Sequence, residues 1–514
     1  MKQTQELASL HLSHQHDART KQMEIDNEEE INPRDRSAII LRQKQRGQIE
    51  SSPTHPTSTL FSVDDTSTVN MINEQMLYLS RGLSDHSLQA LQYFVDLTRN
   101  DHAESLRFFL IKSNILDILP HFMHNKNNSD IQISTLTILL NMTKNASNDV
   151  TSAVAFSSCT QYFSDMLNSD NPEILENVSL VIGNLGDSTC HAVNHLLSLG
   201  LSKPILHILH NSSPNPQQLY SLLWALRCLC GGGDRSLLSQ QHEQPHCPDQ
   251  PSPSIGVSDE LIHLSSEFSF IASFLQHRSP EIVDVCVCCL YRLAQKNILA
   301  LSHLLENNTA VHLLNLLPSL SGETTSFLII RLLGSYLSLS QKHAQELIDI
   351  NIVPVIAQLL VTTTSDDTRF GIAWIAANIA LGPPSQINHL FRTGIPTSFI
   401  LRSAYLNDRI IREVSFLFVG LVDNAPDKMG ELVKVGLVQC LLDMVMRKDC
   451  DLVRNAMDCL VKLIRILPDE RGGVLREIVE GPGMRSIVQY QNHPDQKLQH
   501  LASSIIAFTE EELG

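Results

Sequence analysis

The residue pattern in this sequence that is best suited to bind a ligand is a tryptophan followed four residues later by an asparagine. Trp374 and Asn378 form such a pair, and residues four apart lie on one face of a helix. An Asn amide can donate hydrogen bonds to an extended peptide backbone and accept them from it. The face of a Trp ring attracts the cationic tip of Lys or Arg by about 0.5–2 kcal/mol. Repeated on stacked helices, the pair would bind a basic, extended peptide.

This frame recurs along the chain at a nearly constant interval. Its asparagine position falls, in chain order, on Asp96, Asn141, Asn184, Cys228, Arg292, Ser335, Asn378, Gly420 and Lys462. Seven of the eight intervals span 42–45 residues, and the eighth spans 64 because it contains the Pro/Gln/His/Ser-rich stretch 240–259. A period near 42 residues is typical of the armadillo and HEAT helical repeats.

The elements that position the frame also repeat. A short helix ends at Gly or Asn, an aliphatic helix follows, and a longer helix holds the frame. Glycines mark the corner after the first helix at Gly200, Gly394 and Gly436. Prolines open the second helix at Pro204, Pro354 and Pro396. Three helices per unit favour armadillo over HEAT. We therefore predict an all-α, right-handed armadillo solenoid of nine to ten units over 75–508, with the third helices lining a concave groove.

Composition narrows the choice of partners. The 38 Lys and Arg against 55 Asp and Glu give a formal charge of −17, which argues against nucleic-acid and anionic-membrane binding and suits a basic protein partner. No apolar run is long enough to span a bilayer, and the N-terminus has no signal-peptide core. An odd count of eleven cysteines in such a chain indicates reduced thiols in the cytosol or nucleus.

The first 74 residues differ from the rest and are predicted to be mostly disordered. Within them, the segment 31–50 is basic and has apolar residues between its charges. Its cations are Arg34, Arg36, Arg42, Lys44 and Arg46. Two interpretations remain open: a short helix that forms on a partner, or a solvated basic patch. An acidic tail, 509–514, closes the chain.

The sequence offers no catalytic or metal-binding arrangement. The cysteines of the run 286–289 are too close together for a tetrahedral metal site and lie within an apolar helix, so core packing is the better interpretation. The Gly-rich stretch 230–234 ends a helix and lacks the Lys of a phosphate loop. We therefore predict a non-enzyme without cofactor or metal.

Several strings resemble one family. They are GNLGDSTC (183–190), LLWALRCLCGG (222–232), RLLGSYL (331–337), IAWIAANIALG (372–382), REVSFLF (412–418) and LRQKQRGQI (41–49). In their order and spacing they are similar to importin-α, and the similarity covers about residues 31–508.

The resemblance implies an adaptor that shuttles between cytoplasm and nucleus. It would bind basic nuclear localisation signals of cargo and couple them to an importin-β-like carrier through the basic segment 31–50. The implied signal-binding residues are Asn141, Asn184, Asp187, Trp224, Arg331, Trp374, Asn378, Glu413 and Phe416.

The ladder of Trp and Asn departs from the family pattern in most units. Thr137 and Leu180 replace Trp, and Cys228 replaces Asn. We therefore expect the best anchor for a basic peptide at Trp374, Asn378 and Glu413. The alternative hypothesis is an armadillo interaction scaffold or assembly factor that has lost signal binding. A lone Trp on a helix is also often a core residue.

Overall fold

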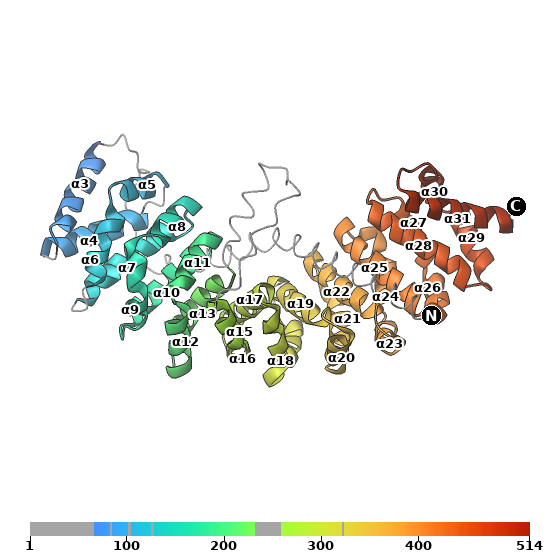
Figure 1. Ribbon diagram of the computed structural model, residues 1–514, viewed down its shortest axis with the longest axis horizontal. Helices are drawn as coiled ribbons and strands as arrows, with labels where there is room; N and C mark the ends of the chain where they lie inside the picture. The colour runs from blue at the N-terminus through green and yellow to red at the C-terminus, as the bar shows by residue number, and fades with distance from the viewer. Residues whose placement is uncertain are drawn as a thin grey trace, which may run out of the picture. The chain divides into compact units, whose positions relative to one another are not determined.

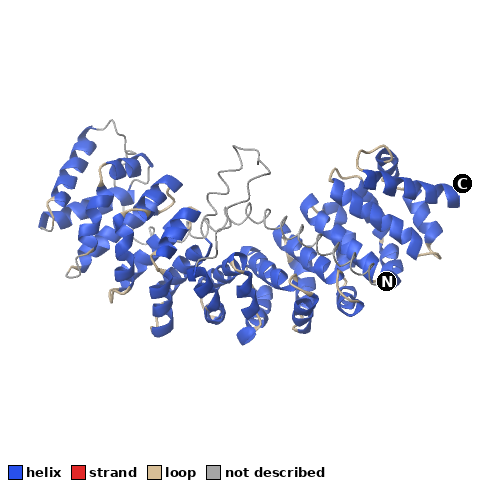
Figure 2. Ribbon diagram, viewed as in Figure 1, coloured by secondary structure: helices blue, strands red, loops and turns tan. Residues whose placement is uncertain are grey.

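The computed structural model describes residues 66–82, 85–100, 104–124, 128–231, 259–320 and 323–513. The chain forms two compact units, which we call unit 1 (1–303) and unit 2 (304–514). Within the described residues every regular element is a helix and no strand occurs (Figure 2). The basic segment 31–50 and nearly all of the stretch 240–259 lie outside the described residues.

Among the described residues, unit 1 contains six helices of 15–17 residues and several shorter ones. Its elements are α3 (Thr66–Ser80), α4 (Asp85–Asn100), α5 (Glu104–Lys112), α6 (Ile115–Met123), α7 (Ser129–Thr143), α8 (Asn148–Ala155), η1 (Ser158–Tyr162), α9 (Phe163–Leu167), α10 (Pro172–Gly186), α11 (Cys190–Ser198), α12 (Ser202–Asn211), α13 (Pro216–Gly231), α15 (Asp259–Ser266), α16 (Phe268–Ala272), η2 (Ser273–Gln276), α17 (Pro280–Lys296) and η3 (Ile298–His303).

Unit 2 continues the same alternation. Its elements are η4 (Glu306–Asn308), α18 (Thr309–Leu316), η5 (Leu317–Ser319), α19 (Glu323–Leu337), α20 (Gln341–Asp349), α21 (Ile352–Thr362), α22 (Asp366–Ala380), α23 (Pro384–Thr393), α24 (Ile395–Arg402), η6 (Ser403–Tyr405), α25 (Asp408–Asn424), η7 (Pro426–Lys428), α26 (Met429–Val435), α27 (Leu437–Val445), α28 (Cys450–Ile466), α29 (Arg471–Glu480), α30 (Met484–Tyr490) and α31 (Gln496–Leu513).

The helices come in sets of three, each ending in a long helix that we call the third helix. Third helices pack on one another in chain order: α4, α7, α10, α13 and α17 in unit 1, and α19, α22, α25, α28 and α31 in unit 2 (Figure 1). The first set holds only α3 and α4 among the described residues. This arrangement confirms the predicted all-α armadillo fold, because each set buries its apolar face against the next.

The corner between first and second helices needs a left-handed residue. Gly200, Gly394 and Gly436 have φ of 67°, 70° and 108°. Asn114 and Asn351 take the same place with φ of 63° and 69°, since Asn tolerates this region better than other residues with a Cβ. The sequence rule of Gly or Asn at the corner therefore has a conformational cause.

Several third helices begin at a capping side chain, whereas the N-cap residue of α17, Ser279, makes no such hydrogen bond. Asn128 and Asn171 each accept from two backbone N–H groups at the starts of α7 and α10. In unit 2, Ser365 and Asn407 each accept from one backbone N–H group at the starts of α22 and α25, and Asp449 accepts from two at the start of α28. Each cap satisfies backbone donors that the helix itself leaves unpaired.

Side-chain contacts join the two helix sets that flank the stretch 232–258. Lys203 Nζ on α12 lies 2.6 Å from Glu260 Oε1 on α15. His210 Nε2 lies 2.8 Å from Glu267 Oε2, and its ring stacks on Phe270 with centroids 3.6 Å apart. The described repeats on either side of this stretch therefore remain packed as neighbours.

Candidate peptide-binding surface

The structure places the predicted site residues on third helices or at their ends. In unit 1, Asn141 lies on α7, Asn184 on α10 and Trp224 on α13, while Asp187 is the C-cap of α10. In unit 2 the residues lie on three neighbouring helices. Arg331 lies on α19, Trp374 and Asn378 on α22, and Glu413 and Phe416 on α25.

Asn141 and Asn184 link successive third helices of unit 1. Asn141 Nδ2 donates to Thr98 Oγ1 on α4 at 3.2 Å. Asn184 Nδ2 donates to Thr143 Oγ1 on α7, also at 3.2 Å. Both Asn side chains are only half-buried. Each contact uses one side-chain amide N–H and so fixes the plane of the amide. Within the described ranges, the side-chain carbonyl oxygen and the second amide N–H of both residues make no other hydrogen bond.

Asn378 in unit 2 makes a different contact. Its Nδ2 donates to the carbonyl oxygen of Trp374 in its own helix at 3.0 Å. An amide link from α25 back to α22 comes instead from Asn424, whose Nδ2 donates to Ala380 O at 3.0 Å. The frame did not single out Asn424, although it lies four residues after Gly420.

Trp224 is packed between two neighbours. Its side chain is 7% exposed, and a Cβ on Gly183 of α10 would lie 2.3 Å from the indole atoms Cδ1 and Nε1. The guanidinium carbon of Arg227, three residues further along α13, lies 4.5 Å from the ring centroid. A glycine therefore makes room for the indole, and an arginine of the same helix covers it.

Trp374 has the same kind of environment in unit 2. It is 5% exposed, and a Cβ on Gly334 of α19 would lie 2.4 Å from its Cζ3. Arg331, itself 3% exposed, places its guanidinium carbon 5.1 Å from the Trp374 centroid. The same carbon lies 5.8 Å from the Phe327 ring and 5.9 Å from the Phe370 ring.

A second arginine extends this aromatic cluster. The guanidinium carbon of Arg409 on α25 lies 3.9 Å from the Phe370 centroid, and its Nη1 is 3.1 Å from Asp367 Oδ1. Arginines of the chain itself thus lie against the aromatic rings of unit 2, as Arg227 does in unit 1. A ligand cation would have to displace them before it could stack on either tryptophan.

The remaining predicted residues differ in accessibility. Glu413 is buried, whereas Phe416 and Asp187 are half-buried. Asn141 and Asn184 in unit 1 and Asn378 in unit 2, which are half-buried, are thus more exposed than the two indoles or the Glu413 side chain.

Sequence reasoning missed Arg227, Arg409 and Phe370 as parts of these clusters. Arg227 had a local signal, because a residue three positions after Trp224 shares its helix face. Arg409 and Phe370 lie on different repeats, and no short-range pattern connects them.

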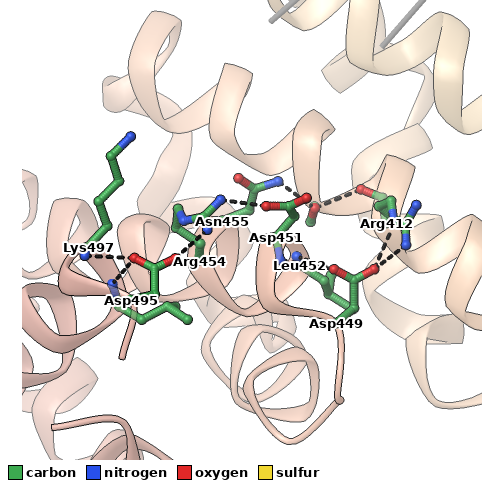
Figure 3. A network of polar contacts seen from close by, with 10 residues as sticks. Arg412, Asp449, Asp451, Leu452, Arg454, Asn455, Asp495 and Lys497 are labelled. Carbon is green, nitrogen blue, oxygen red and sulfur yellow. Dashed lines mark hydrogen bonds and ion pairs between the residues drawn. The ribbon is translucent and has the colours of Figure 1, made fainter. Parts of the chain in front are cut away.

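A network of charged side chains joins α25, α28 and α31 (Figure 3). Arg412 Nε donates to Asp449 Oδ2 at 2.8 Å, and Arg454 Nη2 donates to Asp495 Oδ2 at 2.6 Å. Both aspartates also accept from the first backbone N–H groups of the following helix. We call these two Arg–Asp pairs the capping clamps, since each ties the cap of one third helix to the preceding third helix.

The clamps lower the pKa values of their aspartates. Burial alone would raise the pKa of Asp449, but the N–H groups of Leu452 and Asp451 and the Arg412 guanidinium outweigh it and hold that pKa below its usual value. The hydrogen bond from Arg454 is the main cause of the lowered pKa of Asp495. Both carboxylates are therefore charged at neutral pH.

The described residues contain no group of three or more His, Cys, Asp or Glu that could hold a metal ion. The cysteines of the run 286–289 are buried in α17, where Cys286 Sγ lies 3.0 Å from Ile271 O. Burial raises the pKa of Cys159 to about 12, so this thiol is protonated at neutral pH. No single described helix is long and apolar enough to cross a bilayer, and only the bent pair α20–α21 meets that test jointly.

Comparison with known proteins supports the fold. No family model matches the chain. The crystal structure of an engineered protein aligns with 85% of this chain and 98% of its own, at 14% identity and a TM-score of 0.69. A designed armadillo repeat protein aligns with 47% of this chain and 100% of its own, at 16% identity and a TM-score of 0.41. Another, in complex with the peptide (KR)4, gives the same identity, the same share of this chain and the same TM-score, over 99% of its own length.

Proposed function

We propose that this protein is a non-catalytic interaction scaffold that binds an extended polypeptide along the third helices of unit 1. The observation that carries the proposal is the geometry of Asn141 and Asn184. Each amide is held by a threonine of the preceding repeat and keeps hydrogen-bonding capacity at a half-buried surface. A preorganised amide loses little conformational entropy when it binds a peptide group.

Acidic side chains on the same helices, about 16 Å along the helix axis from the two amides, and the charge of the chain as a whole favour a basic peptide. Exposed carboxylates, Asp130 and Glu173, lie in the first turns of α7 and α10. The chain as a whole has a formal charge of −17. Complementary charge raises the association rate and selects against acidic segments.

The test is a titration of a fluorescent bipartite basic peptide, followed by anisotropy. Asn184→Ala and Asn141→Ala should each weaken binding about threefold to tenfold, since each removes one hydrogen-bonding arm. Asn455→Ala is the matched control, because Asn455 makes the same kind of inter-repeat bond to Ser415 in unit 2. Equal losses from all three variants would mean that the asparagines act only through stability.

A finer proposal makes the scaffold a nuclear import adaptor that shuttles between cytoplasm and nucleus. Its support is the importin-α-like strings and the basic segment with Arg42, Lys44 and Arg46. Because Arg331 and Arg227 cover the two tryptophans, cargo signals would bind mainly through the asparagines. The expected anchor of a cargo signal is therefore the pair Asn141 and Asn184 in unit 1 and no longer Trp374.

A separate experiment addresses the finer proposal. Charge reversal of Arg42, Lys44 and Arg46 should abolish capture by immobilised importin-β in dilute salt. Capture of the wild-type chain that is lost in this variant supports the adaptor. If the wild-type chain binds basic peptides but not importin-β, the scaffold proposal stands and the adaptor fails.

A further inference from the structure

A cavity of about 360 Å³ lies within unit 2, where the end of one second helix meets the next repeat. One side is formed by Leu317 and Pro318 of η5, which continues α18, and the other by Val355 and Leu359 of α21. These two elements pack on each other, and Thr368 at the start of α22 also lines the cavity. The volume is at the lower end of the range found for ligand pockets.

The cavity contains a buried hydroxyl that has no hydrogen-bond partner. Thr368 is 1% exposed, and its Oγ1 makes no hydrogen bond with any group of the described residues. Its backbone N–H donates to Ser365 Oγ at 3.3 Å, so only the hydroxyl is left without a partner. A buried hydroxyl of this kind lowers stability, because it has lost its hydrogen bonds to water. A ligand in the cavity would supply the missing bond.

Other repeats show that the fold does not need a hydroxyl at this place. Thr368 is the third residue after the N-cap of its third helix. In α7, α10, α17, α25 and α28 the same place holds a buried aliphatic residue. These residues are Ile131, Ile174, Ile282, Ile410 and Leu452. Because an aliphatic side chain packs there without an unpaired polar atom, the repeat itself does not account for Thr368.

The lining of the cavity selects an uncharged occupant. None of the described residues that line it carries a charge. The two charged residues that flank Thr368 are already paired. Asp367 lies 3.1 Å from Arg409, and Arg369 lies 2.7 Å from Asp366. A charged ligand group would therefore lose its hydration without gaining an ion pair.

The lining changes in character from the rim to the inner end. Gln358, Thr362 and Thr364 are exposed and form a rim of amide and hydroxyl groups. An amide can donate to a peptide backbone and accept from it. Below the rim lie the apolar walls, and Thr368 is at the buried inner end. A tyrosine in a polypeptide presents the same order of groups: the peptide backbone, an apolar ring and a terminal hydroxyl.

We propose that this cavity binds the side chain of an unphosphorylated tyrosine from a partner polypeptide. The ring lies between η5 and α21, and the phenol hydroxyl forms a hydrogen bond with Thr368 Oγ1. The peptide groups beside the tyrosine meet Gln358 at the rim. The site is separate from Asn141 and Asn184 of unit 1 and does not depend on the function proposed for them.

The probe is a short peptide, N-acetylated and C-amidated, with one central Tyr flanked by Gly and Ser. Its binding to the full chain is followed by saturation-transfer NMR up to about 5 mM peptide. A peptide with Phe in place of Tyr should bind about tenfold more weakly, because it leaves the Thr368 hydroxyl without a partner. A phosphotyrosine peptide should also bind at least about tenfold more weakly, since no lining group neutralises the phosphate.

Two variants of Thr368 test the hydroxyl itself. Thr368→Val keeps the shape of the side chain and should abolish the preference for Tyr over Phe. Its thermal midpoint should stay the same or rise, because the buried hydroxyl without a partner is gone. Thr368→Ser keeps a hydroxyl and should retain the preference for Tyr.

A matched pair of substitutions on α21 tests the cavity. Val355→Phe places a ring in the cavity and should abolish binding of both the Tyr and the Phe peptide. Val361→Phe introduces the same side chain on the same helix at a position that is 64% exposed and outside the lining. It should leave binding unchanged.

The proposal fails if the Tyr peptide does not bind to the wild-type chain or binds no better than the Phe peptide. It also fails if Thr368→Val lowers the thermal midpoint by several degrees, because the hydroxyl would then serve the fold. Equal affinity for p-cresol, the tyrosine side chain alone, would show that no polypeptide is required. Self-association that both Val355→Phe and Tyr405→Ala abolish would assign the cavity to a second copy of the chain, since Tyr405 is 90% exposed.

Discussion

Unit 1 and unit 2 share one repeat but use different chemistry to join their third helices. Between α4, α7 and α10 the links are neutral, from Asn141 to Thr98 and from Asn184 to Thr143. Unit 2 also has Asn links, and it adds ion pairs: Arg409 with Asp367, and the two capping clamps of α25, α28 and α31.

This difference shows that the repeat determines where neighbouring third helices are in contact but not which side chains form the contact. Neutral amides remain available to a peptide backbone after one internal bond. Paired charges are largely satisfied by each other and respond to salt and pH. The two units should therefore differ in what they bind and in how solution conditions affect them.

The largest effect should come from the aromatic cluster of unit 2. Trp374→Ala removes a buried indole and leaves the buried Arg331 guanidinium without its nearest aromatic face, so we expect a loss of about 3–5 kcal/mol in the free energy of unfolding. The chain has two tryptophans, and in this variant the fluorescence of Trp224 follows unit 1 alone.

Urea unfolding followed by circular dichroism and by Trp224 fluorescence measures this effect. We expect an early dichroism transition and a fluorescence transition at the wild-type position. A loss below about 1 kcal/mol would show that Trp374 is a surface platform, as the frame alone suggests.

Acid should act more on unit 2 than on unit 1, because two ion-paired aspartates in unit 2, against Glu260 in unit 1, have a lowered pKa. The pKa values of Asp449 and Asp495 are lower in the folded chain than their usual values, so their contribution to stability is present above about pH 4. That contribution is lost as the pH falls below this value through the folded-state pKa values.

Two single-tryptophan variants separate the units in this test. Trp224→Phe leaves Trp374 as the reporter of unit 2, and Trp374→Phe leaves Trp224 as the reporter of unit 1. Between pH 6 and pH 3, the urea midpoint of unit 2 should fall further than that of unit 1. Equal shifts would contradict the expectation that the acid-sensitive links of unit 2 outweigh that of Glu260 in unit 1.

The smallest effects should come from single links. Thr143→Val removes the acceptor of Asn184 and should cost about 1 kcal/mol at any salt concentration. Arg454→Gln removes the ion pairs with Asp451 and Asp495 and should lower the urea midpoint slightly in dilute salt and not measurably in 1 M NaCl. If the loss of stability in Thr143→Val depends on salt and that in Arg454→Gln does not, the contrast between neutral links in unit 1 and ionic links in unit 2 is wrong.

Local patterns in the sequence predicted most of the fold. The 42–45-residue interval, the corners at Gly200, Gly394 and Gly436 and the long helix at each frame all appear in the structure. Each of these features depends on backbone preference and on a periodic apolar face. Both are properties of residues close together in the chain.

Whether the residues of the candidate site are buried or exposed depended on the tertiary structure. The pair Trp374 and Asn378 identifies a helix face, but the indole is buried because Gly334 admits it and Arg331 covers it from the preceding repeat. Burial depends on side chains contributed by neighbouring repeats about 40 residues away, and no short-range pattern contains that information.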